Sequence, residues 1–521
     1  MTALNSSKND EAMEHSRVES QCVVDYVGKF MKDPSCKTSI CLMTGLTIGT
    51  LALTNFQVDA STGKERPPNI LLIVSDDQGY NDLGILRSDL ITPHLDRLAR
   101  EGVRLTNFYM AWPACTPSRG AFLTGRYPQR NGTYDMFRNE APDYGYLYPP
   151  EEYAVSFERI GGMDTREILI SRLLAEKGYR CALFGKWDLG SLQRYLPLAR
   201  GFHEFYGFVN TGIDYFTHER YGIPSIYRNN QPTTEDRGTY ITDLIQREAL
   251  KFIETNSDRP FFLYLAFNAP HNASHLDPRI RSAPQAPEKY KRMYPQLREE
   301  YVSAPNHPYW KNAEVPTRQT RDLLYRASIT AMDDAIGAVL KKLDELRLTD
   351  NTFVLFFSDN GGTGIADNSP LRGQKGELFE GGIRVCALAR YPGRIPPGTV
   401  CEEFLSGLEV FPTLAQLAQS PIPPDLKLDG FDMLPVLQGQ QKSPRQRMFW
   451  QRREWKAARV GTWKWIENRD GEFLFDLARD VGETTNLVHQ QPTKAEELRQ
   501  AFQEWVREME AAEPRGPFRD Y

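Results

Sequence analysis

The sequence has few cysteines for its length. Only seven of its 521 residues are Cys, and three of these lie in or before an N-terminal apolar stretch. The other four are Cys115, Cys181, Cys386 and Cys401. So few thiols in a chain this long do not make a disulfide scaffold. The fold must therefore depend on a hydrophobic core, for which a hydrophobic fraction of 40% is ordinary.

A concentrated charge of either sign is also absent. The 63 Lys and Arg residues and the 68 Asp and Glu residues give a net charge of −5, and no basic tract occurs. This argues against nucleic acid as a partner, so an anionic ligand must be met by a local cluster of cations. Internal repeats and low-complexity segments are missing as well.

The sequence has no apolar run long enough for a clear membrane span. Residues 40–54 are apolar but shorter than a span, and Val58-Asp59-Ala60 resembles a signal-peptidase site. We expect translation to start at Met31, with a signal peptide over residues 31–60 and export to the periplasm or the medium. A membrane anchor is the alternative.

Two apolar segments end in the same polar pattern. Residues 69–75 and 352–358 do not alternate between apolar and polar side chains. Such runs are typical of strands buried on both faces of a mostly parallel sheet. Ligands bind beyond the carboxyl ends of such strands, although a solvated turn also favours Asp. The side chains that follow the two segments are Asp76, Asp77, Asp359 and Asn360. Oxygen ligands of this kind suit Ca²⁺ or Mg²⁺ better than Zn²⁺.

Helices and strands alternate along most of the chain, which predicts an α/β fold. We expect helices over residues 92–102, 165–178, 240–255 and 321–348, and further buried strands over residues 179–187 and 260–267. In the helix over residues 321–348, Asp333 and Asp334 are expected to face solvent. Residues 456–475 read as antiparallel strands and residues 493–513 as a helix, which predicts a small α+β domain.

The segment Cys115 to Arg126 combines a thiol, a proline, a hydroxyl and two guanidiniums. Pro117 suits the first turn of a helix and Ser118 can cap it. A helix N-terminus is also a favourable site for an anion. The guanidinium of Arg119 adds a positive charge with paired donors, which suits an oxyanion.

This segment resembles the signature of the type I, formylglycine-dependent sulfatases, which is Cys-x-Pro-Ser-Arg followed by Thr-Gly-Arg. The aromatic segment over residues 200–220 resembles the arylsulfatase B and N-acetylgalactosamine-sulfatase branch. The resemblance implies an alkaline-phosphatase-like mixed sheet flanked by helices over residues 67–440. It also implies a C-terminal antiparallel sheet with one helix over residues 441–521, after a leader and linker over residues 1–66.

The resemblance further implies a set of site residues. Cys115 would be oxidised to formylglycine by a maturation enzyme, and Arg119 would polarise that group. Ca²⁺, in preference to Mg²⁺, would be held by Asp76, Asp77, Asp359, Asn360 and the group made from Cys115. Lys186 and Lys375 would bind sulfate. His271, in the segment Asn-Ala-Pro-His after a strand, would protonate the leaving alcohol.

The chain departs from the family pattern at Asp188, where Gly-Lys-Trp-His-Leu-Gly is usual. The family His contacts sulfate and takes a proton during turnover. A carboxylate can act as a base but cannot donate to sulfate. Asp188 is therefore a working base, a determinant of preference for a cationic or amino substituent, or the mark of a weakened enzyme.

The function implied is hydrolysis of a sulfate ester on a carbohydrate, either a polysaccharide or a glycosaminoglycan-like oligosaccharide. The partners implied are that substrate and the maturation enzyme, with neither nucleic acid nor a stable membrane partner. The alternatives are a phosphonate or phosphate ester hydrolase, and a catalytically silent carbohydrate-binding relative. Two N-glycosylation patterns, at Asn131 and Asn272, adjoin the expected site and are treated as chance matches.

Overall fold

A large mixed sheet runs through the part of the chain that the structure describes. The structure is a computed structural model, and it describes residues 66–134, 161–307 and 312–519. The expected signal peptide lies outside these residues. The sheet has eleven strands in the order β15-β2-β14-β13-β1-β10-β4-β5-β8-β9, with β16 beside β2. This confirms the predicted α/β fold.

The middle of the sheet is parallel. Its strands are β13 (Thr352–Ser358), β1 (Asn69–Ser75), β10 (Phe261–Ala266), β4 (Arg180–Lys186) and β5 (Glu204–Phe208). Every residue of β13, β1 and β10 is buried, as the unbroken apolar runs predict. Since the strands run in the same direction, their carboxyl ends meet at one edge of the sheet. That edge is where the site lies.

Antiparallel strands flank the parallel core. On one side are β14 (Arg384–Arg390) and β2 (Val103–Tyr109), with β15 (Thr399–Cys401) and β16 (Leu405–Ser406) parallel to β2. On the other side are β8 (Ile226–Arg228) and β9 (Gln231–Pro232). Short pairs lie off the sheet: β3 (Gly161–Met163) with β21 (Pro517–Arg519), and β6 (Glu219–Arg220) with β7 (Ile223–Pro224).

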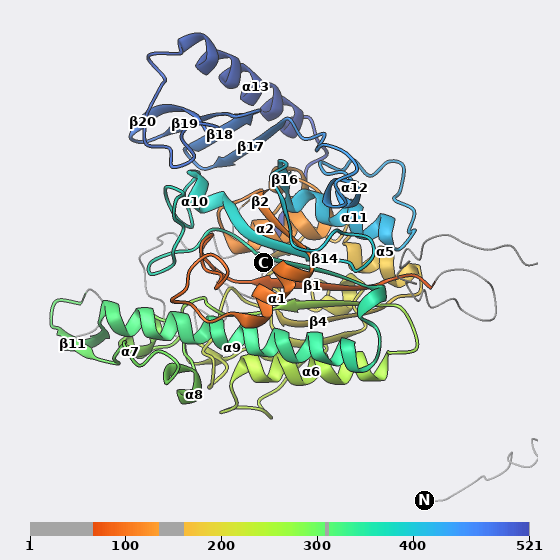
Figure 1. Cartoon of the computed structure of the whole chain (residues 1–521), viewed down its shortest axis with the longest axis vertical. Helices are drawn as coiled ribbons and strands as arrows, with labels where there is room; N and C mark the ends of the chain where they lie inside the picture. Colours follow the sequence, from red (N-terminus) through yellow and green to blue (C-terminus); the bar gives the residue numbers. More distant parts are fainter. Residues whose placement is uncertain (1–65, 135–160, 308–311, 520–521) are drawn as a thin grey trace, which may run out of the picture. The chain divides into compact units, whose positions relative to one another are not determined.

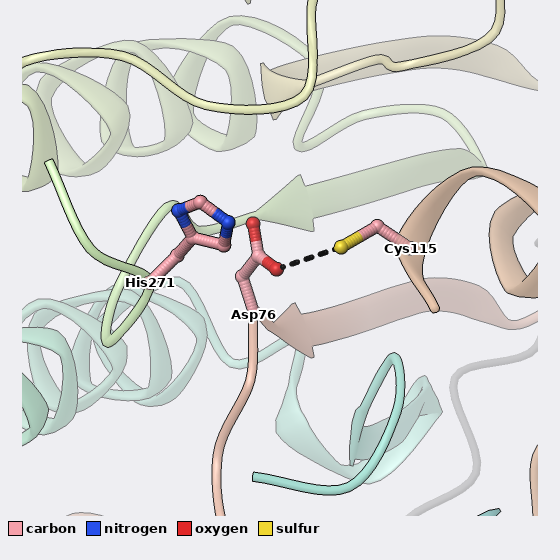
Figure 2. Close-up of side chains that lie close together, drawn as sticks. All are labelled: Asp76, Cys115 and His271. Carbon is pink, nitrogen blue, oxygen red and sulfur yellow. Dashed lines mark hydrogen bonds between the residues drawn. The ribbon is translucent and has the colours of Figure 1, made fainter. Parts of the chain in front are cut away.

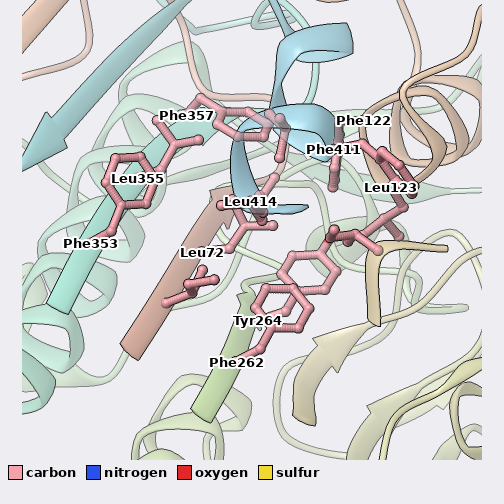
Figure 3. Close-up of a cluster of buried hydrophobic side chains, with 14 of the residues drawn as sticks. Leu72, Phe122, Leu123, Phe262, Tyr264, Phe353, Leu355, Phe357, Phe411 and Leu414 are labelled. Atoms are coloured by element: carbon pink, nitrogen blue, oxygen red, sulfur yellow. The ribbon is translucent and has the colours of Figure 1, made fainter. Parts of the chain in front are cut away.

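Helices cover both faces of the sheet, and each face has its own apolar cluster. One face packs against α1 (Pro93–Glu101), α6 (Ile241–Thr255) and α9 (Arg318–Glu345). In Figure 1, α6 and α9 run side by side along the sheet, and they are in contact. The other face packs against α2 (Cys115–Thr124), α5 (Ile170–Glu176) and α11 (Val410–Leu417). Figure 3 shows Phe122 and Leu123 of α2 and Phe411 and Leu414 of α11 against side chains of β1, β10 and β13.

The C-terminal part is a four-stranded antiparallel sheet with one helix, as predicted. The strands are β17 (Arg447–Arg452), β18 (Trp455–Val460), β19 (Trp463–Asn468) and β20 (Gly471–Asp476). Helix α13 (Pro492–Glu510) buries Leu498, Phe502, Trp505 and Met509. The domain boundary at residue 440 stays a prediction, because residues 55–521 form one unit.

The described part of residues 276–316 contains short regular elements. These are α7 (Pro278–Arg281), α8 (Glu288–Lys291) and the hairpin of β11 (Tyr301–Ala304) and β12 (Ala313–Pro316). The remaining short helices include α3 (Pro128–Asn131), α10 (Glu380–Ile383) and α12 (Leu434–Leu437). Within residues 66–519, apart from the two undescribed internal stretches, no helix is both long and apolar enough to cross a membrane.

One expectation about α9 is wrong. Asp333 does not face solvent: its side chain is buried and accepts hydrogen bonds from the backbone nitrogens of His94, at 3.0 Å, and Leu95, at 2.7 Å. These nitrogens belong to the first turn of α1, whose own cap residue, Thr92, makes no such bond. The carboxylate of one helix therefore caps the start of another.

Candidate active site

The two polar pairs predicted to lie together, Asp76-Asp77 and Asp359-Asn360, are side by side in the structure. Strands β1 and β13 are parallel and in register, with Ser75 opposite Ser358. The residues that follow them therefore emerge together, and the backbone nitrogen of Asp77 donates to Asp359 Oδ1 at 3.4 Å. One ligand atom from each of four buried residues, namely Asp76, Asp77, Cys115 and Asp359, lies within 4.8 Å of the others.

Cys115 is the first residue of α2, and every residue of that helix is buried. The helix begins earlier than predicted: its cap position is Ala114, and the Ser118 hydroxyl donates to the Trp112 carbonyl at 2.7 Å instead of capping. Cys115 Sγ lies 3.3 Å from Asp76 Oδ1, with His271 on the far side of that carboxylate (Figure 2). Burial raises the pKa of the Cys115 thiol, as do the neighbouring carboxylates. The unmodified thiol is thus a poor nucleophile here.

Arg119 points at this cluster from the second turn of α2. Its guanidinium is fully buried and donates to Asp359 Oδ2 at 2.7 Å and to the Tyr264 hydroxyl at 2.9 Å. Sequence reasoning assigned this fork to an oxyanion. In the structure it contacts a carboxylate, and this contact can hold Asp359 in position. Its predicted role toward the group made from Cys115 stays a prediction.

Two lysines complete the charge balance. Lys186, at the end of β4, places Nζ 2.7 Å from Asp76 Oδ2. Lys375 places Nζ 2.7 Å from Asp77 Oδ1 and 3.2 Å from Cys115 Sγ. Burial alone would raise the pKa of Asp77, but Lys375, aided by His271 and a hydrogen bond from Asn360, holds it well below its usual range. Both cations therefore stand within reach of any group bound at Cys115.

His271 follows β10 at the same edge. Its Nε2 lies 3.8 Å from Asp77 Oδ2, and its Nδ1 lies 2.7 Å from the Asn272 carbonyl oxygen. Burial lowers the pKa of His271 to about 3 even though the Asp77 carboxylate opposes the shift, so the imidazole is neutral near pH 7. An anionic ester next to Nε2 would favour the protonated form.

Asp188 lies two residues beyond Lys186 with a left-handed backbone, at φ 58°. It is 3% exposed, and its Oδ2 lies 3.7 Å from Lys186 Nζ. Among the described residues this oxygen has no hydrogen-bond partner. Lys186 is near this oxygen but too far away to donate a hydrogen bond to it. A buried carboxylate oxygen in this position can accept a proton or bind a cationic substituent.

Two asparagines also carry unpaired groups. Asn360 donates to Asp77 Oδ1 at 2.8 Å, yet its own side-chain oxygen is buried and, within residues 66–519 as described, without a partner. Together with the three carboxylates, that oxygen gives the donor set that a hard cation requires. Neither side-chain polar atom of Asn268 has a partner in the same described region. Sequence reasoning missed Asn268, although it opens the segment that ends at His271.

Other polar residues near the site are structural. His218 is buried and its Nε2 lies 2.8 Å from the Thr239 carbonyl oxygen, as expected for a structural histidine. Asn131 is fully buried and donates to Thr124 Oγ1, which supports treating its glycosylation pattern as chance. Asp333 and Asp334 take no part in the site.

Comparison with known proteins identifies the family. The profile named sulfatase matches residues 68–420, and the profile of the N-sulphoglucosamine sulphohydrolase C-terminal region matches residues 374–512. The chain is 34% identical to N-acetylgalactosamine-6-sulfatase from Canis lupus familiaris, covering 83% of this chain and 80% of that one. It is 32% identical to human arylsulfatase A, covering 81% and 84% of the two chains.

A solved structure agrees with these relatives. Ps i-CgsB in complex with k-i-k-neocarrahexaose has a TM-score of 0.70 and 30% identity, covering 84% of this chain and 93% of the other. The matched family region spans β1 through α11 and so includes every residue of the site described above. The chain therefore belongs to the sulfatase family and is a sulfatase.

Proposed function

We propose that this sulfatase removes sulfate from a sulfated carbohydrate, with a formylglycine made from Cys115 and a bound Ca²⁺. The observation that carries the proposal is the position of Cys115 Sγ, 3.3 Å from Asp76 and 3.2 Å from Lys375 in a buried ring of acids and cations. The relatives support a carbohydrate substrate, since one is named for an amino sugar and one structure holds an oligosaccharide.

The metal site would consist of the carboxylates of Asp76, Asp77 and Asp359 and the unpaired oxygen of Asn360. When bound, the cation supplies fixed positive charge for sulfate oxygens, and the formylglycine supplies a hydrated aldehyde as nucleophile. Arg119 would keep Asp359 in position through its contact of 2.7 Å.

The side chains around that centre have separate tasks. Lys186 and Lys375 neutralise the ester as negative charge builds on its oxygens, and their fixed positions avoid reorganisation. His271 holds a proton at Nε2 for the leaving oxygen. Asp188 accepts a proton in place of the family histidine, and the nearby Lys186 stabilises its charged form.

The test is anion release from a panel of sulfated oligosaccharides and matched phosphate esters, with the enzyme produced together with the formylglycine-generating enzyme. Sulfate release that Cys115→Ala abolishes is the expected result. Phosphate release alone would favour the phosphate ester hydrolase. If mass spectrometry finds Cys115 converted but neither anion is released, the result favours a catalytically silent protein that binds carbohydrate.

Export is a separate proposal. The apolar segment and the cleavage pattern ending at Ala60 support a signal peptide that starts at Met31. N-terminal sequencing of the mature protein should find Ser61. A retained leader in a membrane fraction would favour the anchor.

A further inference from the structure

A cavity of about 360 Å³ opens beside the metal-ligand cluster. Asp77 forms part of its wall, and Asp77 Oδ1 lies 4.0 Å from Cys115 Sγ. Pro270 and Asn272, which flank His271 in the chain, also line it. The cavity therefore adjoins the proposed metal site at Asp77, and its volume is in the range of small-molecule sites.

The opposite wall comes from the first turn of α9 and carries two arginines, Arg318 and Arg321. They are three residues apart, so they lie on the same face of the helix. In the described parts of the chain, neither guanidinium forms a hydrogen bond or an ion pair. Arg326, further along the same helix, instead pairs with Asp322 at 2.7 Å and with Asp89 at 2.5 Å.

The placement of these arginines is unfavourable for the protein alone. The first turn of α9 contains no acidic residue, although the N-terminus of a helix favours negative charge. Two neighbouring like charges repel each other as well. Ser282 also contributes to the wall of the cavity. An oxyanion bound in the cavity would supply the counter-charge that the two arginines lack.

We infer that this cavity is a subsite for a second acidic group of the substrate, a sulfate or a carboxylate distinct from the ester cleaved at Cys115. The inference rests on the proposed function and narrows the substrate to a saccharide with two acidic groups. Arg318 and Arg321 recognise the second group, since guanidinium forks fit such oxyanions. Lys186 and Lys375 do not compete for it, because the proposed function assigns both of them to the scissile ester.

The test compares three synthetic disaccharides with the same scissile sulfate: one with no other acid, one with a second sulfate and one with a uronate carboxylate. The readout is the ratio of kcat/KM for each doubly acidic sugar to that for the singly acidic one. We expect Arg318→Gln and Arg321→Gln each to lower this ratio about tenfold. Whichever doubly acidic sugar shows the drop identifies the group.

Arg507→Gln is the matched control, because it removes the same charge from an exposed position on α13 that does not line the cavity. It should leave the ratio unchanged. If wild-type enzyme cleaves the sugars and the α9 variants keep its ratio for both doubly acidic sugars, the subsite is wrong while the proposed function stands.

A binding experiment separates the two proposals if no sugar is cleaved. Calorimetry with the Cys115→Ala protein should give tighter binding of a doubly acidic sugar than of the singly acidic one. Adding Arg321→Gln should weaken that binding about tenfold. Equal affinities for the three sugars, or no effect of Arg321→Gln, would overturn the inference whatever the activity.

Discussion

Lys464 Nζ lies 2.8 Å from Glu380 Oε1, and neither side chain is exposed. Lys464 belongs to β19 of the C-terminal sheet, whereas Glu380 opens α10, five residues after Lys375. A second buried carboxylate, Glu483, lies 2.9 Å from the same Nζ. This pairing joins the C-terminal sheet to the segment that supplies a proposed sulfate ligand.

Replacing Lys464 with Met should therefore destabilise the whole protein. Removing one partner of a buried ion pair costs about 3–5 kcal/mol. Here two buried carboxylates lose Lys464, and among the described residues only Glu380 keeps a second cation, Arg384 at 3.3 Å. The control is Lys456→Met, since Lys456 pairs with Glu467 at side-chain exposures of 31% and 38%. Such an exposed pair contributes about 0–1 kcal/mol. Urea unfolding of both variants is the measurement, and equal losses would contradict the prediction.

Metal binding can be measured without turnover. Calorimetric titration of the chelator-treated protein with Ca²⁺ should show one site, and Asp359→Asn should weaken binding by more than about 100-fold, because it removes a charged ligand. Arg119→Lys should weaken it by about 10–100-fold, the range for a residue that orients a ligand. Asp344→Asn, on the surface of α9, is the control. Unchanged affinity in Asp359→Asn would exclude that residue as a ligand.

The meeting of the side chains that follow β1 and β13 could be predicted from the sequence because it is encoded locally. Each acid directly follows an unbroken apolar run, and parallel strands bring their carboxyl ends together. The capping role of Asp333 could not be predicted in this way. It depends on α1, which is more than 230 residues earlier in the chain. Nothing in the sequence around an acidic residue in the middle of a helix indicates that it caps a distant helix.

The cavity arginines illustrate the same limit. Arg321 opens the helix predicted over residues 321–348, but Arg318 lies before it, and only the structure shows that α9 begins at Arg318. The lack of a counter-charge is likewise visible only once the neighbouring segments are folded. The contact of Arg119 with Tyr264 likewise depends on where β10 lies in the sheet. Residue types and strand ends can thus be read in advance, whereas partners distant in sequence cannot.

Kinetics of two substitutions at Asp188 can distinguish a role as a base from a general loss of active-site structure. If it is a base, Asp188→Asn should lower kcat by about 10²–10⁴-fold with little change in KM, since the amide cannot take a proton. Asp188→His tests whether the residue is specialised: a tenfold higher turnover on the same sugar would indicate a weakened enzyme instead.

The buried carboxyl of Asp333 should make stability depend on pH. Its side chain is 1% exposed, and burial raises its pKa to about 7 although two backbone nitrogens donate to it. In the unfolded chain an Asp titrates near pKa 4, so between about pH 4 and 7 the folded state holds the proton more tightly. The stability of the wild type relative to Asp333→Asn, which cannot titrate, should therefore rise as the pH falls from 8 to 5. The expected gain is about 2–3 kcal/mol.

Urea unfolding of both proteins at the two pH values measures it, with Asp334→Asn as a control for charge at the next position of the helix. A difference that stays constant, or that grows toward pH 8, would show that the carboxylate caps α1 in its charged form.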